Sequence, residues 1–593
     1  MSDTILHRLH ENGRIRPNAP AYYEKLGNAW VPTSWQEYTN QVRQAAKALV
    51  ALGVQPGQNT TILGFNRPEW VIFDLASMLM GGAPAGIYTT NSPHECKYII
   101  ENSEAPIILV ENEHQWEKIK EVRDDMSNLK HIVTMKGTKI DDDMTLDWDS
   151  FLAKGDETPD EKIDELMNGL DYHGLATLIY TSGTTGPPKG VMLSHENLAS
   201  TSANAQKLLK LDSTDSVVSY LPLSHIAEQM FTIHASITAG YQVYYAQYPP
   251  QEHLNDNFKE VKPTLVFGVP RIWERFAAGV QAKLAESSGV KAKIASWARG
   301  VGREVTAIRN QGGEPTGMLA RKYNIANKLV FSTVKAGLGF DNLRNAVSGA
   351  APIAPEILNF FGSLDIPILE VYGQSEGSGP TTVTSPGRIK FGTVGQPWPE
   401  CEVVIADDGE VLAKGPNIFL GYYRNEEATK NDLVDGWLHS GDLGQFDDDG
   451  YLTIIGRKKE IIITSGGKNI APKNIEAALK NIDLVSQAVV IGEQRRFITA
   501  LLTLNEETLP DFVQAHGLEG QTLHDNPVVI DHLQKEIDEK VNSLFARVEQ
   551  VRKFTVLPRD FTVEDGELTP TLKIKRRIVN ENFSDEIESM YVE

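Results

Sequence analysis

The first third of the chain alternates between apolar runs and segments with helical periodicity. Apolar side chains recur at intervals of three and four residues after Ser34, which forms a capping box with Glu37, so a helix is predicted up to Gly53. Beyond it, the pattern predicts strands at 60–65, 85–88 and 106–110 that alternate with helices at 69–80, 94–102 and 114–123. This alternation is typical of α/β proteins with parallel sheets covered by helices on both faces. The acidic, weakly patterned segment 139–171 is expected to be a surface connection.

Two later changes in pattern divide the rest of the chain. From about residue 393, short strands with hairpin turns at Asp408-Gly409 and Asp449-Gly450 predict a β-barrel-like subdomain that extends to residue 456. Beyond residue 460, the pattern predicts a compact α+β unit with strands at 461–463, 487–491 and 498–504 and a charged helix at 529–545. The expected architecture is an α/β N-terminal domain over residues 1–456 and a smaller α+β C-terminal domain over residues 461–593.

Composition narrows the class of protein. A chain of 593 residues is too long for one core, so several subdomains are expected. The 57 basic and 79 acidic residues give a net charge of −22, which argues against a nucleic-acid binder. Cys96 and Cys401 have no Cys or His neighbours at ligand spacing, so neither a disulfide framework nor a zinc site is expected. Without a signal-peptide pattern or a long apolar run, a cytoplasmic protein is expected.

A run of small and hydroxylated residues follows a predicted buried strand at 176–180. The sequence of Leu178–His195 is LIYTSGTTGPPKGVMLSH. Small residues let backbone N–H groups approach an anion, hydroxyl groups add donors and Lys189 adds a positive charge, so a phosphate-binding loop is predicted. An ordinary turn is shorter than this run. A Walker A loop would need Ser or Thr after its lysine, whereas Gly190 follows Lys189.

Further polar clusters come after predicted strands. In LPLSHIAEQ, His225 follows a strand at 217–220 and lies either near a ligand at the carboxyl end of the sheet or beneath the next helix as a packing residue. The small residues 349–351 would let a flat ring lie against the backbone. The motif VYGQSEGSG supplies the ring of Tyr372 for stacking on adenine and the carboxylate of Glu376 for Mg²⁺. Taken alone, that motif would be a glycine-rich loop with a solvated Glu.

The last third of the chain adds three charged motifs. In GWLHSGDLGQF, Asp442 follows a glycine in a turn, where its carboxylate is able to accept hydrogen bonds from two vicinal hydroxyl groups. The basic residues of GRKKE, at 456–460, are either solvated surface or a pivot. GELTPTLKIKRRIV contains Lys573 and the basic run 575–577, which is either a solvated patch or a landing site for the phosphates of a ligand.

Together, these motifs resemble those of the adenylate-forming superfamily, which includes acyl-CoA synthetases, luciferases and the adenylation domains of peptide synthetases. The resemblance covers roughly residues 15–580, with motifs in the expected order at 180–190, 372–377, 441–442, 456–459 and Lys573. The segments 85–105 and 461–476 further resemble long-chain acyl-CoA synthetases of the bubblegum type. Many relatives have Ser-Gly two residues before the catalytic lysine. This chain has Thr571-Leu572 there, a form that resembles the long-chain branch.

The resemblance implies a role for each motif residue. The residues that would bind ATP are Thr181, Ser182, Gly183, Thr184, Thr185, Gly186, Lys189, Gly349, Ala350, Ala351, Tyr372, Gly373, Gln374, Ser375, Asp442 and Arg457. Mg²⁺ would be met by Thr184 or Thr185 and by Glu376, and the catalytic residues would be Lys573, His225 and Glu376. Lys459 would be the hinge, within residues 457–460, on which a mobile C-terminal domain rotates. That rotation would bring Gly466, Gly467 and Lys468 to coenzyme A.

The implied reaction converts a fatty acid, ATP and coenzyme A into acyl-CoA, AMP and pyrophosphate through an acyl-adenylate. Each buried methylene contributes about 0.8 kcal/mol, so an apolar tunnel would favour a long acid, and Trp273, Phe276 and Gly349 are candidates to line it. An aryl- or medium-chain acyl-CoA ligase would differ only in its acid pocket. A non-catalytic nucleotide or acyl sensor on the same fold is the alternative from another class. A peptide-synthetase adenylation domain would need a carrier domain as acceptor.

A basic amphipathic segment bears on where such an enzyme works. Between Lys291 and Asn310, one side of the predicted helix is apolar (Ile294, Trp297, Val301, Val305 and Ile308) and the other carries Lys and Arg. Such a helix either packs on its own domain or lies against a membrane surface. The glycines at 300 and 302 weaken the helix. Peripheral membrane contact of a cytoplasmic enzyme therefore stays open at this point.

Overall fold

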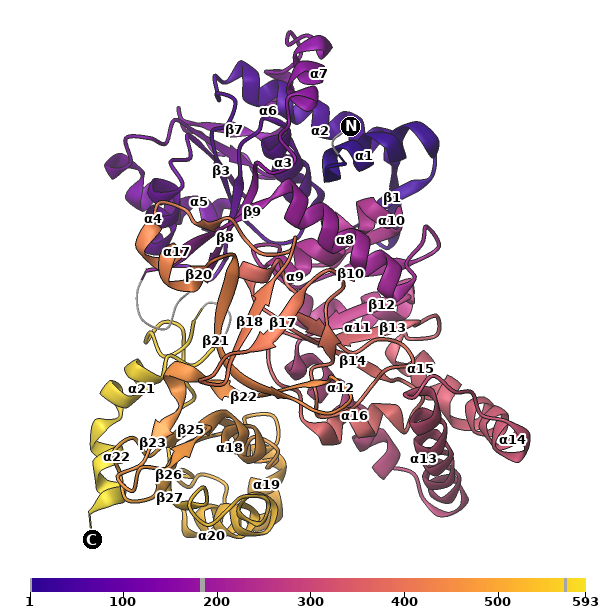
Figure 1. Ribbon diagram of the computed structural model, residues 1–593, viewed down its shortest axis with the longest axis vertical. Helices are drawn as coiled ribbons and strands as arrows, with labels where there is room; N and C mark the ends of the chain where they lie inside the picture. The colour runs from indigo at the N-terminus through magenta and orange to yellow at the C-terminus, as the bar shows by residue number, and fades with distance from the viewer. Residues whose placement is uncertain (1–2, 182–186, 570–572, 593) are drawn as a thin grey trace. The chain divides into compact units, whose positions relative to one another are not determined.

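The computed structural model (Figure 1) describes residues 3–181, 187–569 and 573–592, which form two compact units. The first unit comprises residues 3–181, 187–404 and 412–439, and the second comprises residues 405–411, 440–569 and 573–592. Several of the sheets are parallel and alternate with helices, which confirms the predicted α/β class. The domain boundary within residues 457–460 stays a prediction.

The largest sheet of the first unit has eight strands in the order β19-β9-β8-β4-β3-β5-β6-β7. Their bounds are β3 (Thr60–Leu63), β4 (Pro84–Ile87), β5 (Ile107–Val110), β6 (His131–Thr134), β7 (Thr145–Asp147), β8 (Leu175–Thr181), β9 (Lys189–Ser194) and β19 (Gly421–Tyr422). Strands β3 to β7 and the pair β4–β8 are parallel, as the alternating pattern predicts. The predicted helices are present as α2 (Trp35–Ala51), α3 (Pro68–Leu79), α4 (Pro93–Asn102) and α5 (Glu113–Val122). Every residue of α3 is buried, so this helix forms part of the core rather than a cover.

The segment 139–171 is more structured than predicted. It contains β7, α6 (Trp148–Ala153) and α7 (Asp160–Asn168). Trp148 and Phe151 are buried, and the Phe151 ring lies 5.8 Å from that of Phe73 in α3. The Asp147 side chain caps α6 by accepting a hydrogen bond from the Ser150 backbone N–H. Most residues of this segment are exposed or half-exposed, as a surface connection requires, while the aromatic side chains anchor the short helix α6.

Two smaller sheets also belong to the first unit. One has the order β12-β13-β14-β15-β16, with bounds Leu265–Gly268, Asn345–Ser348, Ile368–Tyr372, Thr382–Val383 and Gln396–Pro397. The other has the order β10-β11-β1-β2, with bounds Ser216–Ser219, Gln242–Tyr245, Pro20–Leu26 and Ala29–Ser34. Trp273 and Phe276, the candidates to line an acyl tunnel, lie in one core cluster with Phe340 and Phe361. The second sheet joins the start of the chain to residues near 245, so the N-terminus is part of the unit.

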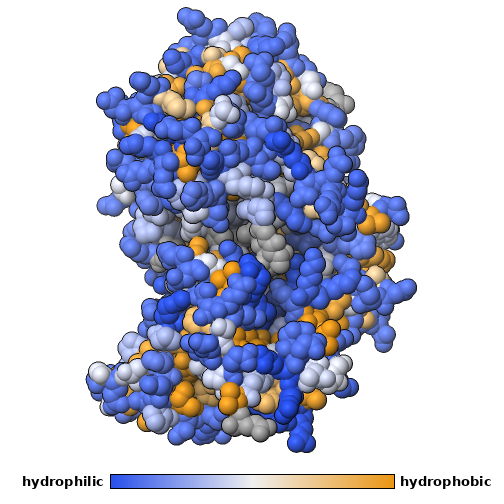
Figure 2. Space-filling model, turned by 90° about the vertical axis from the view of Figure 1, so that its left-hand side faces the viewer, coloured by the Kyte–Doolittle hydropathy of each residue, from blue (hydrophilic) through white to orange (hydrophobic). Residues whose placement is uncertain are grey.

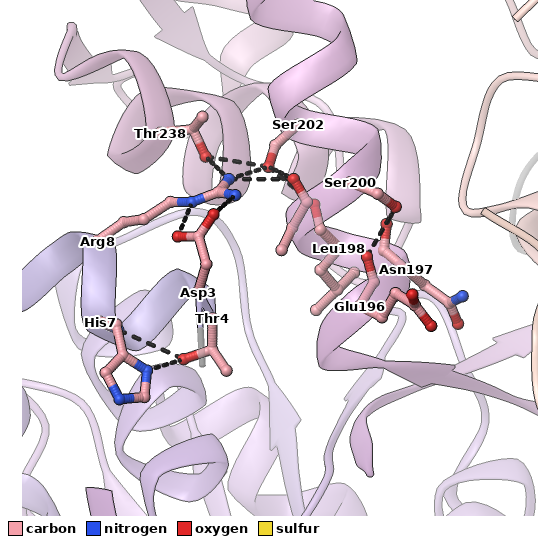
Figure 3. A network of polar contacts seen from close by, with 11 residues as sticks. Asp3, Thr4, His7, Arg8, Glu196, Asn197, Leu198, Ser200, Ser202 and Thr238 are labelled. Atoms are coloured by element: carbon pink, nitrogen blue, oxygen red, sulfur yellow. Dashed lines mark hydrogen bonds and ion pairs between the residues drawn. The ribbon is translucent and has the colours of Figure 1, made fainter. Parts of the chain in front are cut away.

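The N-terminal helix α1 (Ile5–Ile15) is fixed by one arginine. The Arg8 guanidinium forms an ion pair with Asp3 at 2.6 Å and donates hydrogen bonds to the Ala199 carbonyl, to Ser202 and to Thr238, as Figure 3 shows. These acceptors belong to α8 (His195–Leu209) and α10 (Ala235–Ala239). A single planar group with several donors therefore connects three helices.

A helical hairpin extends from the first unit. Helices α13 (Gly289–Arg309) and α14 (Gly317–Ala326) lie side by side at the lower right of Figure 1. The π-helical turn η3 (Asn327–Phe331) and α15 (Ser332–Leu338) continue from α14. A Cβ atom on Gly302 would lie 2.1 Å from the Ser363 carbonyl oxygen, so the glycine that weakens α13 also permits its close packing.

The apolar side of α13 packs mainly inside the protein. Val301 and Val305 are buried in a cluster that also contains Ala326, Val330 and Phe331 of the following helical segment. Of the two interpretations of the amphipathic pattern at 291–310, packing on its own unit therefore applies to these side chains. Trp297 differs, because 38% of it is exposed.

The second unit contains a three-stranded sheet, β25 (Val485–Ile491), β26 (Ile498–Leu504) and β27 (Val551–Val556), and a short hairpin of β23 (Ile462–Ile463) and β24 (Asn469–Ile470). Helices α18 (Pro472–Leu479) and α20 (Pro527–Glu536) contribute Ile475, Leu479, Val529 and Leu533 to its core. The single helix predicted at 529–545 is instead α20, the π turn η6 (Ile537–Val541) and the 3₁₀ turn η7 (Asn542–Leu544). The prediction of an α+β unit is confirmed.

A further sheet has the order β17-β18-β21-β20, with β22 paired to β21, and its strands are β17 (Glu402–Ile405), β18 (Glu410–Lys414), β20 (Leu433–Val434), β21 (Trp437–Phe446) and β22 (Leu452–Arg457). The remaining helices and helical turns are η1 (Arg123–Asp125), α9 (Ile226–Gln229), η2 (Met230–His234), α11 (Pro250–Val261), α12 (Pro270–Ala285), α16 (Pro355–Gly362), η4 (Ser375–Gly377), α17 (Glu426–Asp432), η5 (Lys458–Glu460), α19 (Leu509–His516), α21 (Arg576–Asn582) and α22 (Ser584–Tyr591). Hydrophilic residues predominate on the face of the molecule in Figure 2, with hydrophobic residues scattered among them.

Candidate active site

The phosphate-loop motif lies between two strands of the largest sheet. Strand β8 pairs antiparallel with β9, and Thr181 at the end of β8 faces Lys189 at the start of β9. The predicted strand at 176–180 and the helix after His195 are confirmed, and Ser194 caps that helix. The predicted ATP- and Mg²⁺-binding residues Ser182, Gly183, Thr184, Thr185 and Gly186 lie outside the described residues.

Lys189 is held by residues from another part of the chain. Its Nζ atom lies 3.3 Å from Oδ2 of Asp432 and 4.2 Å from the centre of the Tyr422 ring. The Tyr422 hydroxyl is 2.8 Å from Oε1 of Glu376 and 2.9 Å from Oδ2 of Asp432. The four residues therefore form one polar cluster that contains a lysine, a tyrosine and two carboxylates. We call it the lysine–carboxylate cluster.

The backbone explains how this cluster assembles. Strand β19 pairs antiparallel with β9, which sets Tyr422 opposite Val191, two residues from Lys189. The Phe419 backbone N–H donates a hydrogen bond of 2.9 Å to the Glu376 carbonyl, which joins η4 to the same segment. Burial, followed by the neighbouring Glu376 charge, raises the pKa of Tyr422, so its hydroxyl group remains a donor at neutral pH.

Tyr422 and Asp432 were not among the residues predicted from the sequence. Their only local signal is a Gly-Tyr-Tyr segment followed by an acidic helix, a combination common on protein surfaces. Asp432 lies 243 positions after Lys189, so their contact follows from the pairing of β19 with β9 rather than from any local pattern.

The predicted adenine-binding residues lie at the carboxyl ends of two adjacent parallel strands. Strand β13 pairs with β14 through Ser348 and Glu370, so residues 349–351 after β13 lie close to Tyr372, the last residue of β14. A Cβ atom on Gly349 would lie 3.2 Å from the Val371 carbonyl oxygen. Gly373 is more constrained, because its Cβ would lie 1.9 Å from the Gly379 carbonyl oxygen. This edge of a parallel sheet is where ligands bind in open α/β proteins.

Backbone geometry distinguishes the other residues of these two motifs. Ala350 adopts a positive φ of 67°, which is uncommon for a residue other than glycine. Gln374 precedes the 3₁₀ turn η4 and Ser375 begins it. Backbone strain of this kind clusters at binding and catalytic sites.

His225 forms the N-cap of α9. Its Nδ1 atom accepts a hydrogen bond of 3.2 Å from the Ala227 backbone N–H. The capping interpretation of this histidine is therefore present in the structure, while its proximity to a substrate carboxylate stays a prediction. Three residues later, Glu228 is buried, and its carboxylate accepts hydrogen bonds from the hydroxyl groups of Ser219 and Thr232 at 2.8 and 2.7 Å. Burial raises the pKa of Glu228 to about 7.

Asp442 and Arg457 lie opposite each other on β21 and β22 of the second unit. They form an ion pair of 2.9 Å in which the Asp442 side chain is 10% exposed and the Arg457 side chain 42%. Gly441 adopts a φ of 71° and donates its N–H to Glu410 at 2.8 Å, which orients the turn. The structure brings these two predicted nucleotide-binding residues together.

The predicted hinge residue Lys459 is exposed in η5. Its neighbour Lys458 contacts Asp408 and Glu410 at 2.5 and 3.0 Å. The predicted coenzyme A residues Gly466, Gly467 and Lys468 lie in the tight turn between β23 and β24, where the Thr464 N–H donates to the Lys468 carbonyl at 3.0 Å.

Lys573 is exposed, and its backbone is hydrogen-bonded to Thr569. The Thr569 N–H donates to the Lys573 carbonyl at 2.8 Å, and the Lys573 N–H donates to the Thr569 hydroxyl at 3.0 Å. In the basic run after it, Arg576 binds Glu476 at 2.5 Å, whereas Arg577 pairs with Glu581 at 2.6 Å and has a side chain that is 63% exposed. The two interpretations of this run, a solvated patch and a landing site for phosphates, both stay predictions.

The proposed tunnel residue Trp273 is a core residue. It is fully buried, and its indole N–H lies 3.2 and 3.3 Å from the Gly268 and Val347 carbonyl oxygens. Its ring lies within 6.2 Å of the rings of Phe276, Phe340 and Phe361. This packing suggests a structural role for Trp273 rather than direct contact with a substrate.

The site combines small residues and Tyr372 at the carboxyl edge of a parallel sheet with the lysine–carboxylate cluster. The second unit adds exposed lysines on an α+β fold. The chain belongs to the AMP-binding enzyme family. That family matches residues 9–423, and the AMP-binding enzyme C-terminal domain matches residues 459–593.

The relatives are similar over nearly the whole chain. Long-chain-fatty-acid–CoA ligase ACSBG2 of Xenopus laevis is 39% identical, covering 96% of this chain and 81% of that protein. ACSBG2 of Homo sapiens is 37% identical over 96% of this chain and 90% of its own length. Long-chain-fatty-acid–CoA ligase FadD15 of Mycobacterium bovis is 34% identical, covering 99% of this chain and 97% of that protein.

Solved structures confirm the fold. The adenylation domain of a carboxylate reductase from Mycobacterium chelonae matches with a TM-score of 0.77 and 22% identity, covering 100% of this chain and 91% of that one. An anthranilate CoA ligase in complex with anthranoyl-AMP matches with a TM-score of 0.70 and 18% identity, covering 98% and 97%.

Proposed function

We propose that this protein is an AMP-forming long-chain fatty acid–CoA ligase. In the first half-reaction, a fatty acid carboxylate attacks the α-phosphorus of ATP, which forms acyl-AMP and releases pyrophosphate. In the second, the thiol of coenzyme A attacks the acyl carbon, loses its proton and releases AMP. Membership of the AMP-binding family and the near full-length similarity to proteins named long-chain-fatty-acid–CoA ligases support this assignment.

The lysine–carboxylate cluster is the observation that carries the proposal. Lys189 offers a positive charge, and Glu376 with Asp432 offers two carboxylates within reach of the same tyrosine. One or two carboxylates together with phosphate oxygens are the ligand set that Mg²⁺ prefers, so this donor set fits a magnesium–nucleotide site. Bound Mg²⁺ would neutralise charge on the phosphates during the displacement.

Each candidate site residue of the first unit then has a proposed role in adenylation. Tyr372 would stack on adenine beside residues 349–351, while Lys189 would exchange its contact with Asp432 for one with the leaving pyrophosphate. Tyr422 would hold Glu376 in one position during this exchange. The chemistry is displacement at phosphorus, in which the protein contributes alignment and charge stabilisation.

The second unit would supply the residues that change between the half-reactions. Asp442 and Arg457 would contact the ribose and the nucleotide, and Lys573 would bridge the attacking carboxylate and the α-phosphate. Rotation about Lys459 would withdraw Lys573 and present residues 466–468 to coenzyme A. Exposure of Lys459 and Lys573, together with the tight turn at 466–468, supports these roles.

Release of AMP with a panel of acids tests the proposal. Purified protein with ATP, Mg²⁺ and coenzyme A is expected to turn over long-chain fatty acids more efficiently than short ones, since each buried methylene contributes about 0.8 kcal/mol. Omission of coenzyme A should leave acyl-AMP, which hydroxylamine traps as a hydroxamate. Efficient turnover of benzoates alone would assign an aryl-CoA ligase. No turnover of any acid, despite intact ATP binding, would assign a nucleotide sensor.

A further inference from the structure

The helical hairpin of the first unit carries a charge opposite to that of the whole chain. From Gly289 to Phe340 there are nine basic residues and two acidic ones, a net charge of +7 on a protein of −22. From Pro315 to Phe340 the sequence contains no Asp or Glu at all. This locally cationic surface on an acidic protein is complementary in charge to an anionic partner.

Large apolar side chains are exposed within the same stretch. Met318, Ile325 and Leu329 are 65%, 53% and 53% exposed, and their spacing of seven and four residues puts them on one face of the helical segment. The opposite face is accounted for, because Ala326 and Val330 pack into the cluster with α13. The exposed apolar face is therefore additional to the one that holds the hairpin together.

Basic side chains flank this apolar face. Arg321, Lys322 and Lys328 are exposed and lie between the apolar positions in the sequence. Together with Met318, Ile325 and Leu329 they form what we call the cationic helix face. Helix α13 has a similar pattern, with exposed Val290 and Trp297 on either side of exposed Lys293.

An apolar row flanked by Lys and Arg is the pattern of helices that lie in a membrane interface. The apolar side chains enter the boundary between headgroups and acyl chains, and the basic side chains contact anionic headgroups. None of the helices that the structure describes combines the length and hydrophobicity needed to cross a bilayer. Contact through one face is the mode that these residues support.

We propose that the cationic helix face docks this protein onto a bilayer that contains anionic lipids. A second copy of the chain fits the surface less well, since a symmetric dimer would bring two faces of like charge together. A bilayer presents many negative headgroups above an apolar interior, which complements both the basic and the apolar side chains. The inference concerns only the first unit and does not depend on the ligase activity.

Vesicle flotation tests the proposal directly. Wild-type protein is mixed with vesicles of phosphatidylcholine alone or with 30% phosphatidylglycerol, and the floating fraction is measured at increasing NaCl. We expect binding to the anionic vesicles that weakens as salt screens the charges. Each basic residue near an anionic surface contributes about fivefold to binding. The triple variant Arg321→Gln, Lys322→Gln, Lys328→Gln should therefore bind about 100-fold more weakly.

A second variant tests the apolar part of the face. Met318→Gln, Ile325→Gln, Leu329→Gln keeps the charge and suits a helix, and it is expected to lose at least about tenfold in binding to the same vesicles. Matched controls change exposed residues of the first unit outside the hairpin. They are Leu26→Gln with Val31→Gln for the apolar set, and Arg14→Gln, Lys139→Gln and Lys162→Gln for the basic set. Thermal unfolding of every variant establishes that it is folded.

The outcomes that would overturn the proposal are distinct. Wild-type protein that fails to float with anionic vesicles at low salt would refute it. So would folded hairpin variants that bind as well as their controls. A wild-type dimer in light scattering that the apolar variant converts to a monomer would assign the face to a second copy instead. Failure of the acid panel with retained flotation would refute the ligase and leave this surface intact.

Discussion

The two candidate catalytic lysines are held in different ways. Lys189, in the first unit, has its ammonium group against Asp432 and over the ring of Tyr422. Lys573, in the second unit, is exposed, and two hydrogen bonds join its backbone to Thr569. The contacts described for Lys189 thus involve its charged end, and those described for Lys573 involve its main chain.

This difference suggests a division of labour. A side chain held beside the site by neighbouring groups is suited to meet each nucleotide from the same position, so Lys189 needs only to exchange Asp432 for the leaving pyrophosphate. An exposed lysine on a clamped backbone is suited to a contact that forms in one half-reaction and is lost in the next. Of the four predictions that follow, from the largest expected effect on catalysis to the smallest, the first three test this division and the fourth tests a buried carboxyl group near His225.

Replacement of Lys573 should have the largest effect. Lys573→Ala removes a proposed donor to the α-phosphate, and loss of one such donor costs about 100- to 1,000-fold. We expect acyl-AMP formation, measured by pyrophosphate release, to fall by about that factor. Thioester formation from supplied acyl-AMP should stay near the wild-type rate. Arg577→Ala, an exposed cation four residues away, is the control; equal loss of both half-reactions in Lys573→Ala would refute the assignment.

A change at the proposed hinge should affect the other half-reaction. Lys459→Pro fixes φ at the pivot and is expected to leave adenylation intact. Because a misplaced group costs on the order of 100-fold, thioester formation should fall by about that factor. Lys459→Ala, which leaves the backbone free to rotate, should behave as wild type. Normal rates of both half-reactions in the proline variant would place the hinge elsewhere.

Removal of the Tyr422 hydroxyl tests the fixed lysine. Tyr422→Phe keeps the ring beneath Lys189 but removes the hydrogen-bond donor to Glu376 and Asp432. A hydrogen bond to a charged group contributes about 1.5–3 kcal/mol, so adenylation should fall by about tenfold or more, with a higher Mg²⁺ requirement. Tyr423→Phe is the adjacent control, since that hydroxyl contacts Glu104 instead. An unchanged Mg²⁺ titration in Tyr422→Phe would separate the tyrosine from the metal site.

The smallest effect on turnover is expected from Glu228, whose variant should change stability instead. Its folded-state pKa of about 7 exceeds the ordinary 4.5, so the folded protein binds a proton that the unfolded chain releases between these values. Stability from this group is present below pH 4.5 and is lost as pH rises through 7. Glu228→Gln should therefore gain about 2 kcal/mol relative to wild type between pH 5 and 7.5.

Urea unfolding of both proteins at the two pH values measures this difference. The comparison with a variant is necessary because buried His195 and His234, with pKa values lowered to about 4 and about 3, titrate in the opposite sense. Glu165→Gln on the surface of α7 is the control and should show no such gain. A constant difference between wild type and Glu228→Gln would mean that the Glu228 carboxyl group titrates normally.

Much of the fold could be predicted because its determinants are local. Ser34 and Ser194 cap the helices that follow them. The alternation of apolar runs with helical segments predicts that β3, β4 and β5 run parallel to one another. The helices within 139–171 were not predicted, because Phe151 packs against Phe73 in a contact that periodicity does not reveal. The helix at 529–545 was predicted too long because π and 3₁₀ turns retain nearly the same apolar spacing.

The candidate site divides in the same way. Lys189, Tyr372, Glu376 and Asp442 stand in motifs whose residue types and order are recognisable in one dimension. Tyr422 and Asp432 are not, because they become relevant only when β19 joins the sheet beside β9. The exposed face of α14 was missed for a related reason. Its pattern reads as an ordinary amphipathic helix until the packing against α13 shows which side is already occupied.

The π turn η3 has a consequence for the length of the hairpin. An extra residue in a regular helix turns everything beyond it by about 100°, whereas a π turn absorbs one residue locally as a bulge. The π turn at Asn327–Phe331 therefore takes up one extra residue without rotating the side chains of α15 relative to those of α14. Deletion of one residue there would restore a regular helix and keep both flanking faces in place, so chains of either length could present the same surface.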